Sequence, residues 1–336
     1  MDNRPAVDVI IPTYKPTERL PELILLLEKQ TYPVNRIILM NTEEKYFNSL
    51  FYGREFIRKR NHVTVVHLSK LEFNHGRTRA EGVKLSDAPY FICMTDDAKP
   101  KDETLVERLL APILAGQAEF SFARQLPTES SGAIEAFTRR FNYPKTSRIK
   151  SAADLEELGI KTYFFSNVCA AYTRALYDEL GGFEKLAIFN EDMVFAAGAI
   201  KKGYRIAYAA DAKVYHSHNY DGKTQFKRNF DLGVSQAEHP EIFAGISSTG
   251  EGKKLVKQTI SYLKSKKKGH LVPKLIYLSG CKFLGYKLGL KYKHLPFGLI
   301  RKCTLNKEYW MQKNIRTASG NIDATKGYGI SAEERK

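Results

Sequence analysis

Apolar runs alternate with amphipathic stretches along the first hundred residues of the chain. Short runs rich in β-branched residues predict strands at residues 7–11, 36–40, 63–68 and 90–95. Between the first two runs, Thr17 can cap a helix over residues 18–29, and residues 77–85 predict a second helix. Strands separated by helices imply right-handed βαβ units, so we expect an α/β fold with a mostly parallel sheet.

The pattern changes in the rest of the chain. Residues 119–151, rich in Arg, Ser, Thr and aromatic residues, indicate loops or short helices near a site. Residues 162–173 and 205–208 predict further strands, and residues 191–202 predict a helix. After Tyr220 the pattern is helical and aromatic. We therefore expect a main domain over residues 1–240 and a helical, basic region over residues 241–336.

Charge is distributed unevenly along the chain. The 336 residues carry a formal net charge of +16, but basic and acidic residues balance as far as Glu251. Residues 252–302 contain 14 basic and no acidic residues. A nucleic-acid-binding protein usually spreads basic residues over its main domain, so we expect no nucleic-acid partner. A hydrophobic content of 43% is enough to form a core and excludes a disordered chain.

The sequence predicts a cytoplasmic protein. We expect no secretory signal, because no basic segment followed by an apolar one opens the chain. No stretch approaches the roughly 20 apolar residues that span a bilayer. The four cysteines are far apart and form no CxxC pair, which disfavours a zinc site or a disulfide framework and fits a reducing compartment.

Two adjacent carboxylates follow the fourth predicted strand. Asp96 and Asp97 repel each other at a buried strand end unless a cation or hydrogen bonds compensate. Mg²⁺ or Mn²⁺ is the natural partner, because these ions bind one or two carboxylates and complete their shell with phosphate oxygens and water. A turn with a helix-capping Asp before Pro100 explains the pair equally well.

Three further motifs contain side chains that could act in catalysis or bind a ligand. Asp192 opens a predicted helix and could act as a general base, although the helix dipole also favours acids there. His216 and His218 would share one face of a strand, which suits a metal or a phosphate, while structural histidines are commoner. Arg77 and Arg79 enter a helix from a loop and could bind an anion or form a solvated basic turn.

The ends of the predicted strands mark the expected binding edge of the sheet. Ligands of open α/β sheets bind beyond the carboxyl ends of the strands. Those ends hold Pro12, Thr13 and Tyr14, then Asn41 and Thr42, and then the acidic pair. Neither GxGxxG after the first strand nor GxxxxGK[ST] occurs, which disfavours a dinucleotide site and a P-loop.

In their order along the chain, these motifs resemble family 2 glycosyltransferases of the GT-A fold. The similar segments are VDVIIPTYKP, QTYP, FNHGRTR, MTDDAKP, GGF, NED and HSHNY, and they cover about residues 5–240. FNHGRTR, DDAKP and QFKRNFDLGVSQAEH are most similar to bacterial rhamnosyltransferases of surface polysaccharide assembly. The resemblance implies a Rossmann-like, mostly parallel sheet flanked by helices, followed by a C-terminal basic helical extension.

The resemblance implies contacts to a nucleotide-sugar donor. Pro12, Thr13 and Tyr14 would border the base and ribose. Asn41 and Thr42 stand where many relatives have an acidic residue that bonds the base. The other implied nucleotide contacts are Arg77, Arg79 and Asp96.

The resemblance also implies the catalytic groups. Asp97 would be the direct ligand of a divalent metal, Mg²⁺ or Mn²⁺, together with Asp96. The motif DDA lacks the second spaced Asp of the usual DxD motif, so His216 would supply a further ligand or a pyrophosphate contact. Asp192 would be the catalytic base, and Asn167 and Glu191 would contact the acceptor.

The activity implied is transfer of a sugar with inversion. We expect L-rhamnose to move from dTDP-β-L-rhamnose to a hydroxyl of a lipid-linked saccharide in cell-surface polysaccharide synthesis. The alternatives are a transferase that uses another nucleotide sugar, such as a UDP-hexose, and a non-catalytic nucleotide-binding scaffold of a membrane assembly. A nucleotidyltransferase could share the first half of the fold but would not need the Asp192 base.

The basic segment predicts binding to an anionic membrane surface. It mixes lysines with Leu, Ile, Phe and Tyr, and each Lys near an anionic leaflet contributes about 1 kcal/mol. We expect peripheral association with the inner face of the bacterial plasma membrane. A solvated helical extension or a homo-oligomer contact would also explain the segment. The lysines expected at the membrane are Lys266, Lys267, Lys268, Lys274 and Lys282.

Overall fold

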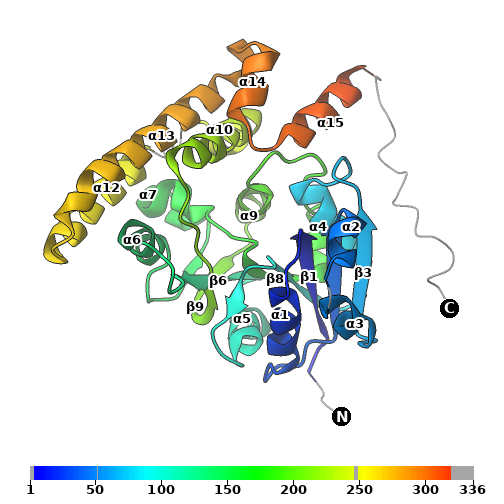
Figure 1. The fold of residues 1–336 in the computed structure, drawn as a ribbon. Helices are drawn as coiled ribbons and strands as arrows, with labels where there is room; N and C mark the ends of the chain where they lie inside the picture. Colours follow the sequence, from blue (N-terminus) through cyan, green and yellow to red (C-terminus); the bar gives the residue numbers. More distant parts are fainter. Residues whose placement is uncertain (1–3, 51, 246–248, 319–336) are drawn as a thin grey trace.

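A central sheet with helices on both faces forms the body of the chain in the computed structural model (Figure 1). The structure describes residues 4–50, 52–245 and 249–318. Strand order in the sheet is β3-β2-β1-β4-β8-β6-β9-β5, and β7 pairs with β9. The strands are β1 (Val7–Tyr14), β2 (Arg36–Thr42), β3 (Val63–Leu68), β4 (Tyr90–Met94), β5 (Lys99–Pro100), β6 (Phe120–Leu126), β7 (Arg148–Lys150), β8 (Cys169–Thr173) and β9 (Ile206–Tyr215).

The helices divide into those that cover the sheet and those that follow it. The first group is α1 (Arg19–Glu28), α2 (Glu44–Asn48), α3 (Gly53–Arg58), α4 (His75–Lys84), α5 (Leu105–Leu114), α6 (Ala133–Asn142), α7 (Leu155–Leu158), α8 (Arg174–Glu179) and α9 (Glu191–Lys201). The second group is α10 (Gly222–Glu238), α11 (Pro240–Phe243), α12 (Thr249–Ser265), α13 (Val272–Leu290), α14 (Phe297–Cys303) and α15 (Lys307–Ala318).

Strand directions confirm the expected mostly parallel sheet. β3, β2, β1 and β4 are parallel to one another. β8 is antiparallel to both β4 and β6, and β6 is parallel to β9. The strands β1, β2, β3, β4, β6 and β9 therefore all point the same way, and their carboxyl ends lie at one edge of the sheet.

Alternating side chains of the strands bury both faces of the sheet. Val7, Val9 and Ile11 of β1 pack into the core shared with α1 and α5. Ile10 faces the opposite core, which contains Val83 of α4. Burial on both faces explains why these strands read as continuous apolar runs in the sequence.

β1 is longer than the sequence pattern predicted. The predicted strand ended before Pro12, but β1 continues through Pro12 to Tyr14. β4 pairs with β1 only as far as Ile10, so from Pro12 onward the strand has β2 as its only neighbour. Proline lacks a backbone N–H and is tolerated where a strand is paired on one side.

Two predictions for the middle of the chain were wrong in part. The strand predicted over residues 162–173 is limited to β8, and residues 159–162 form a 3₁₀ helix. Residues 119–151 contain α6 but also β6, a strand inside the sheet. The buried polar residues Ser121 and Gln125 of β6 obscured its apolar pattern. The strand predicted at residues 205–208 extends through Tyr215 as β9.

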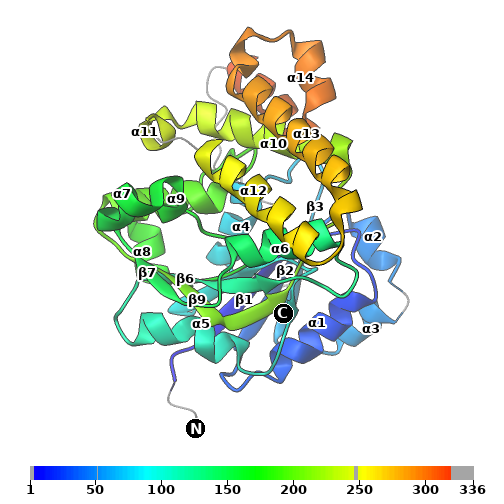
Figure 2. The same cartoon turned by 90° about the vertical axis from the view of Figure 1, so that its left-hand side faces the viewer.

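The helices after the sheet form a layer of their own (Figure 2). α13 packs closely against α10, because Gly233, Gly285 and Gly289 let the two backbones approach; a Cβ at Gly285 would collide with the carbonyl of Phe226. Phe230 of α10 shares a buried cluster with residues of α14 and α15. By its packing, α10 thus belongs to the helical layer. Residues 319–336, the last part of the region predicted over residues 241–336, lie outside the described residues. Within the described residues, every helix is too short or too polar to cross a bilayer.

Candidate active site

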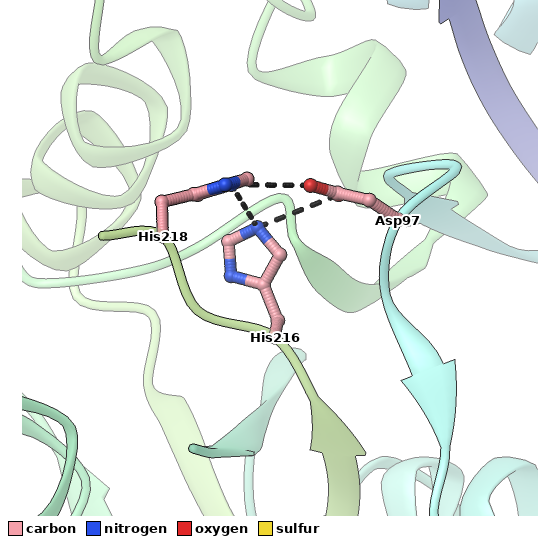
Figure 3. Close-up of side chains that lie close together, drawn as sticks. All are labelled: Asp97, His216 and His218. Atoms are coloured by element: carbon pink, nitrogen blue, oxygen red, sulfur yellow. Dashed lines mark hydrogen bonds and ion pairs between the residues drawn. The ribbon is translucent and has the colours of Figure 1, made fainter. Parts of the chain in front are cut away.

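Three side chains from two distant segments converge at the carboxyl edge of the sheet (Figure 3). Asp97 follows β4, and His216 and His218 follow β9. Asp97 Oδ1 lies 3.4 Å from His216 Nε2, and its Oδ2 lies 3.1 Å from His218 Nε2. The two Nε2 atoms are 3.1 Å apart. The structure therefore brings together the predicted ligands Asp97 and His216 and adds His218.

Neighbouring side chains orient the His216 ring. His216 Nδ1 lies 2.9 Å from Gln125 Oε1, to which Arg139 also donates a hydrogen bond. An amide oxygen accepts only, so Nδ1 carries the proton and the Nε2 lone pair points at Asp97 and His218. This arrangement is typical of metal-bound histidines, whose second nitrogen donates to an oxygen that sets the ring orientation.

Charge at the cluster also suits a cation. Burial lowers the pKa of His216, which keeps the imidazole neutral and able to bind metal. Burial would raise the pKa of Asp97, but the neighbouring imidazoles of His216 and His218 outweigh it and lower that pKa far below its usual range. The donor set fits a divalent cation, because two facing imidazole nitrogens and a carboxylate oxygen lie within 4.8 Å of one another. The two imidazoles disfavour Mg²⁺, which prefers oxygen ligands.

Asp96 has a different environment from Asp97. Burial and the neighbouring charge of Asp97 raise the pKa of Asp96 to about 7, and the Tyr14 backbone N–H donates to it. The cluster of candidate ligands found in the described part of the chain does not contain Asp96. Its carboxylate instead joins the end of β4 to the end of β1, beside the predicted nucleotide residues.

Asp192 is held by two backbone amides at the start of α9. Its Oδ2 accepts from the Asn167 N–H at 2.8 Å, and its Oδ1 accepts from the Met193 N–H at 2.8 Å. Burial and the charge of Glu191 together raise the pKa of Asp192 to about 7. A carboxylate with a pKa near the working pH is suited to take a proton from a hydroxyl.

Glu191 and Asn167 are bound within the protein. Glu191 forms a buried ion pair with Arg79 at 3.0 Å and accepts from Asn167 Nδ2 at 3.1 Å. The side-chain Oδ1 of Asn167 accepts from the Tyr172 hydroxyl at 2.6 Å. The exposed fractions of Glu191 and Asn167 are 5% and 2%. These contacts join Arg79 and Asn167 to the first turn of α9, which also contains Asp192.

The predicted nucleotide residues split between a cavity and the protein interior. Tyr14 and Thr42 line a cavity of about 400 Å³ at the ends of β1 and β2. Thr42 Oγ1 is buried and has no hydrogen-bond partner among the described residues, so it can serve a ligand in this cavity. Thr13 donates to Asn41 at 3.1 Å, and Asn41 also contacts His67, so both side chains are engaged inside the sheet.

Arg77 and Pro12 also lie away from this cavity. Arg77 donates to the carbonyl of Glu72 in the loop before α4. Pro12 is part of β1 and is paired in register with Met40. Among the residues that were predicted to bind the nucleotide, Tyr14 and Thr42 line the cavity, and Asp96 lies next to Tyr14.

The C-terminal helices complete the same cavity. Leu305, Asn306 and Glu308 form one wall of it. Asn306 donates to the carbonyl of Ile188 at 2.8 Å, and Glu308 forms an ion pair with Lys70 at 2.9 Å. The sequence offered no signal for this wall, because its residues lie about 260 positions beyond β2.

Arg228 is a second residue that sequence reasoning missed. It comes from α10 and lines the cavity beside Tyr14 and Thr42. Its guanidinium lies 4.8 Å from the ring centre of Tyr220 and 5.2 Å from that of Phe189. An arginine held by two aromatic rings next to a nucleotide-sized cavity is well placed to meet phosphate. Arg228 lies in the segment QFKRNFDLGVSQAEH, and the similarity of this segment to rhamnosyltransferases was the sequence signal that could have pointed to it.

The lysines predicted to bind membrane lie in two places. Lys266, Lys267 and Lys268 are exposed at the end of α12. Lys274 and Lys282 of α13 line a second, larger cavity between α6, α10, α12 and α13.

Residues 8–181 match the sequence model of Glycosyl transferase family 2. The chain belongs to this family. As a family 2 glycosyltransferase it is an enzyme, and the interpretation of the motifs at the sheet edge is confirmed at the level of the family.

Two relatives match nearly the whole of this glycosyltransferase. The O-antigen chain rhamnosyltransferase RfbN of Salmonella typhimurium is 36% identical over 321 residues, which cover 93% of this chain and 98% of the relative. The O-antigen chain rhamnosyltransferase WbaN of Salmonella anatum is 35% identical over 320 residues, covering 94% and 98%.

A solved structure supports the same fold. The mannosyltransferase PcManGT from Pyrobaculum calidifontis, in complex with GDP-Man and Mn²⁺, superposes with a TM-score of 0.51 at 13% identity. The match covers 96% of this chain and 89% of that one, helical extension included. It confirms the expected α/β fold of the GT-A type.

Proposed function

We propose that this glycosyltransferase moves L-rhamnose from dTDP-β-L-rhamnose to a hydroxyl of a lipid-linked saccharide during O-antigen synthesis. The observation that carries the proposal is identity of 36% and 35% to two O-antigen chain rhamnosyltransferases over 98% of their length. The two relatives match this chain over both the sheet and the helical extension. Because residues of both parts line the cavity beside Thr42, this match supports a shared substrate class.

In the proposed reaction Asp192 acts as the base. Its carboxylate takes the proton of the acceptor hydroxyl while that oxygen bonds to the anomeric carbon of the donor. The bond from the anomeric carbon to the phosphate oxygen breaks, and the nucleoside diphosphate leaves with the electron pair. Glu191, Asn167 and Arg79 hold the first turn of α9, which contains Asp192, and Arg228 lies where it can bind the departing phosphates.

Asp97, His216 and His218 are the residues that would hold a divalent cation. Such a cation supplies positive charge that stabilises the leaving diphosphate. In the same proposal, the cavity lined by Tyr14 and Thr42 takes the base and ribose of the donor, with the ring of Tyr14 as a stacking surface.

The direct test is a transfer assay with purified full-length protein. We expect rhamnose from dTDP-β-L-rhamnose to appear on a lipid-linked saccharide in the presence of Mn²⁺, and we expect chelation by EDTA to remove this activity. UDP-glucose and GDP-mannose serve as control donors in the same assay. Equal transfer from UDP-glucose, or no transfer from dTDP-rhamnose, would contradict the donor assignment.

We also propose that the face of α13 and α14 lies on an anionic membrane. Apolar side chains are exposed there side by side with lysines: Ile276, Tyr277, Phe283 and Leu284 on α13, and Phe297 and Leu299 on α14. Interfacial helices combine exposed apolar groups with lysines in this way. The glycine-mediated packing of α13 on α10 keeps this face rigidly attached to the catalytic body.

Flotation with liposomes tests the membrane face. We expect the protein to float with vesicles that contain phosphatidylglycerol and to stay behind with neutral vesicles. Replacing Ile276 and Leu284 by serine should reduce flotation at least several-fold, because each exposed apolar side chain that enters the interface gains about 1.5–3 kcal/mol when fully buried. The matched control replaces the exposed Leu71 and Leu114, which lie on other parts of the body. Equal flotation of the two variants would rule out this face.

A further inference from the structure

A large cavity lies between the catalytic body and the helical extension. Its volume is about 1190 Å³. Residues of α6, α10, α12 and α13 line it. Stacking of Phe137 on Tyr262, with ring centres 4.8 Å apart, ties α12 to α6. Of the residues that line this cavity, only His218 has a role in the reaction proposed above.

The walls combine an apolar interior with unpaired cations. Val256 and Ile260 of α12 and Leu275 and Leu278 of α13 supply much of the apolar surface. The cavity is also lined by Lys223, Lys253, Lys257, Lys274 and Lys282. In the described part of the chain, none of these lysines has an ion-pair partner.

Lys282 lies deepest among these lysines. Burial lowers the pKa of its ammonium group, and the nearby Arg139 and Arg228 lower it further, while Glu135 opposes them. A partly buried ammonium without an ion pair loses part of its hydration free energy, and no partner charge compensates for that loss. A bound anion would restore its charge balance.

The cavity connects the metal cluster to the proposed membrane face. His218, Asn219 and Tyr220 form its inner end, and the His218 ring stacks on Tyr220 at 4.9 Å. Tyr277 and Phe283 of α13, which are 61% and 50% exposed, also line it. A ligand in the cavity therefore has one end at the reaction centre and the other at the exposed apolar face of α13.

We propose that this cavity binds the isoprenoid diphosphate end of the acceptor, with the diphosphate at Lys282 and the hydrocarbon chain against α12 and α13. The inference rests on the proposed function, from which it takes the lipid-linked acceptor. An anionic amphiphile fits both features of the walls, since the lysines need an anion and the apolar surface excludes a purely polar ligand. A volume above 1,000 Å³ is at the upper end of ligand pockets and suits a long chain.

Binding of farnesyl diphosphate to the full-length protein tests this site. Calorimetry is done with saturating dTDP and Mn²⁺, so that the donor site is occupied. We expect Lys282→Gln to weaken binding at least tenfold, because it removes the charge opposite the diphosphate. Lys287→Gln, on the same helix but exposed and outside the cavity, should change binding less than twofold.

A second variant fills the cavity without removing charge. Val256→Trp places an indole in the cavity and should weaken farnesyl diphosphate binding at least tenfold, while Gln258→Trp, on the same helix but outside it, should not. Inorganic diphosphate and farnesol should each bind at least tenfold more weakly than farnesyl diphosphate. Wild-type affinity in Val256→Trp, or equal affinity for inorganic diphosphate, would overturn the proposal. Loss of binding to anionic vesicles in Val256→Trp would also overturn it, because the cavity would then be part of the membrane face.

Transfer kinetics separate this inference from the proposed function. If the wild-type enzyme transfers no rhamnose, the proposed function fails, whatever the binding data show. If it does transfer rhamnose, Val256→Trp should raise the KM for a lipid-linked acceptor at least tenfold and leave the KM for the lipid-free saccharide unchanged. An equal effect on both acceptors would rule out a lipid site in the cavity.

Discussion

Replacing Asp192 by asparagine is expected to lower sugar transfer by ~10²–10⁴-fold, the usual contribution of a general base. The amide cannot take the acceptor proton, whereas the donor cavity beside Thr42 keeps all its residues. Turnover is measured with donor and acceptor at saturation, and dTDP binding is measured by calorimetry. Donor affinity should stay within a few-fold of wild type.

The Asp192→Asn experiment needs a control for structure. The two carboxylate oxygens accept from the Asn167 and Met193 amides, so an asparagine side chain loses one of these bonds. The loss costs about 1 kcal/mol, and a thermal melt will show whether the variant is folded at the assay temperature. Asp178→Asn, at a surface ion pair with Arg174, is the matched variant that should keep full activity. Near wild-type turnover of Asp192→Asn would refute the base assignment.

The same carboxyl sets the expected pH dependence. Burial and the charge of Glu191 raise the pKa of Asp192 to about 7, and only the ionised form can accept a proton. The rate should therefore rise with pH through about 7 and level off above it. The residual rate of Asp192→Asn should lack this rise, which separates the effect of Asp192 from the titration of other groups.

Replacing Asp97 by alanine is expected to abolish donor binding that depends on Mn²⁺. The substitution removes the carboxylate of the cluster and leaves two imidazoles, which bind Mn²⁺ weakly without it. Mutation of residues that merely support metal ligands costs 10–100-fold, so loss of a ligand should weaken Mn²⁺-dependent dTDP binding by at least about 100-fold. Calorimetry with and without Mn²⁺ measures this difference.

Two further variants make the Asp97 experiment decisive. Asp211→Ala removes an exposed carboxylate of β9 and should change nothing. His218→Ala should weaken Mn²⁺-dependent binding in the same direction as Asp97→Ala, because both side chains belong to the cluster. Unchanged Mn²⁺-dependent affinity in Asp97→Ala would exclude its role as a ligand.

Local patterns in the sequence were enough to predict most of the sheet. Apolar runs gave β2, β3 and β4 within two residues at each end, since burial on both faces of a parallel sheet leaves a continuous apolar signal. The signal failed for β6, where Ser121 and Gln125 are buried by hydrogen bonds that only the folded chain provides. Pro12 led to a predicted strand end that was too early. A proline ends a strand only where its N–H would be needed for pairing, and this depends on which strands pair with β1.

Sequence motifs pointed to the residues that are proposed to carry the chemistry of the site. Asp97, His216 and Asp192 are recognisable by type and by motif order. Glu191 and Asn167 were predicted to touch the acceptor, and in the structure they are hydrogen bonded to each other, with Glu191 also paired with Arg79. Their partners are far away in the chain, so no local pattern could show that these side chains are already occupied.

The sequence by itself determined the α/β class, the family motifs and the separation of a charge-balanced body from a basic extension. Each of these follows from residue type and spacing along the chain, which local burial and charge dictate. Tertiary structure decided what the extension does around the site. It places Asn306 and Glu308 in the wall of the donor cavity and Lys282 in a second cavity that ends at His218. The physical reason is close packing of α13 on α10 through Gly233, Gly285 and Gly289, a contact between surfaces about 50 residues apart that no local periodicity encodes.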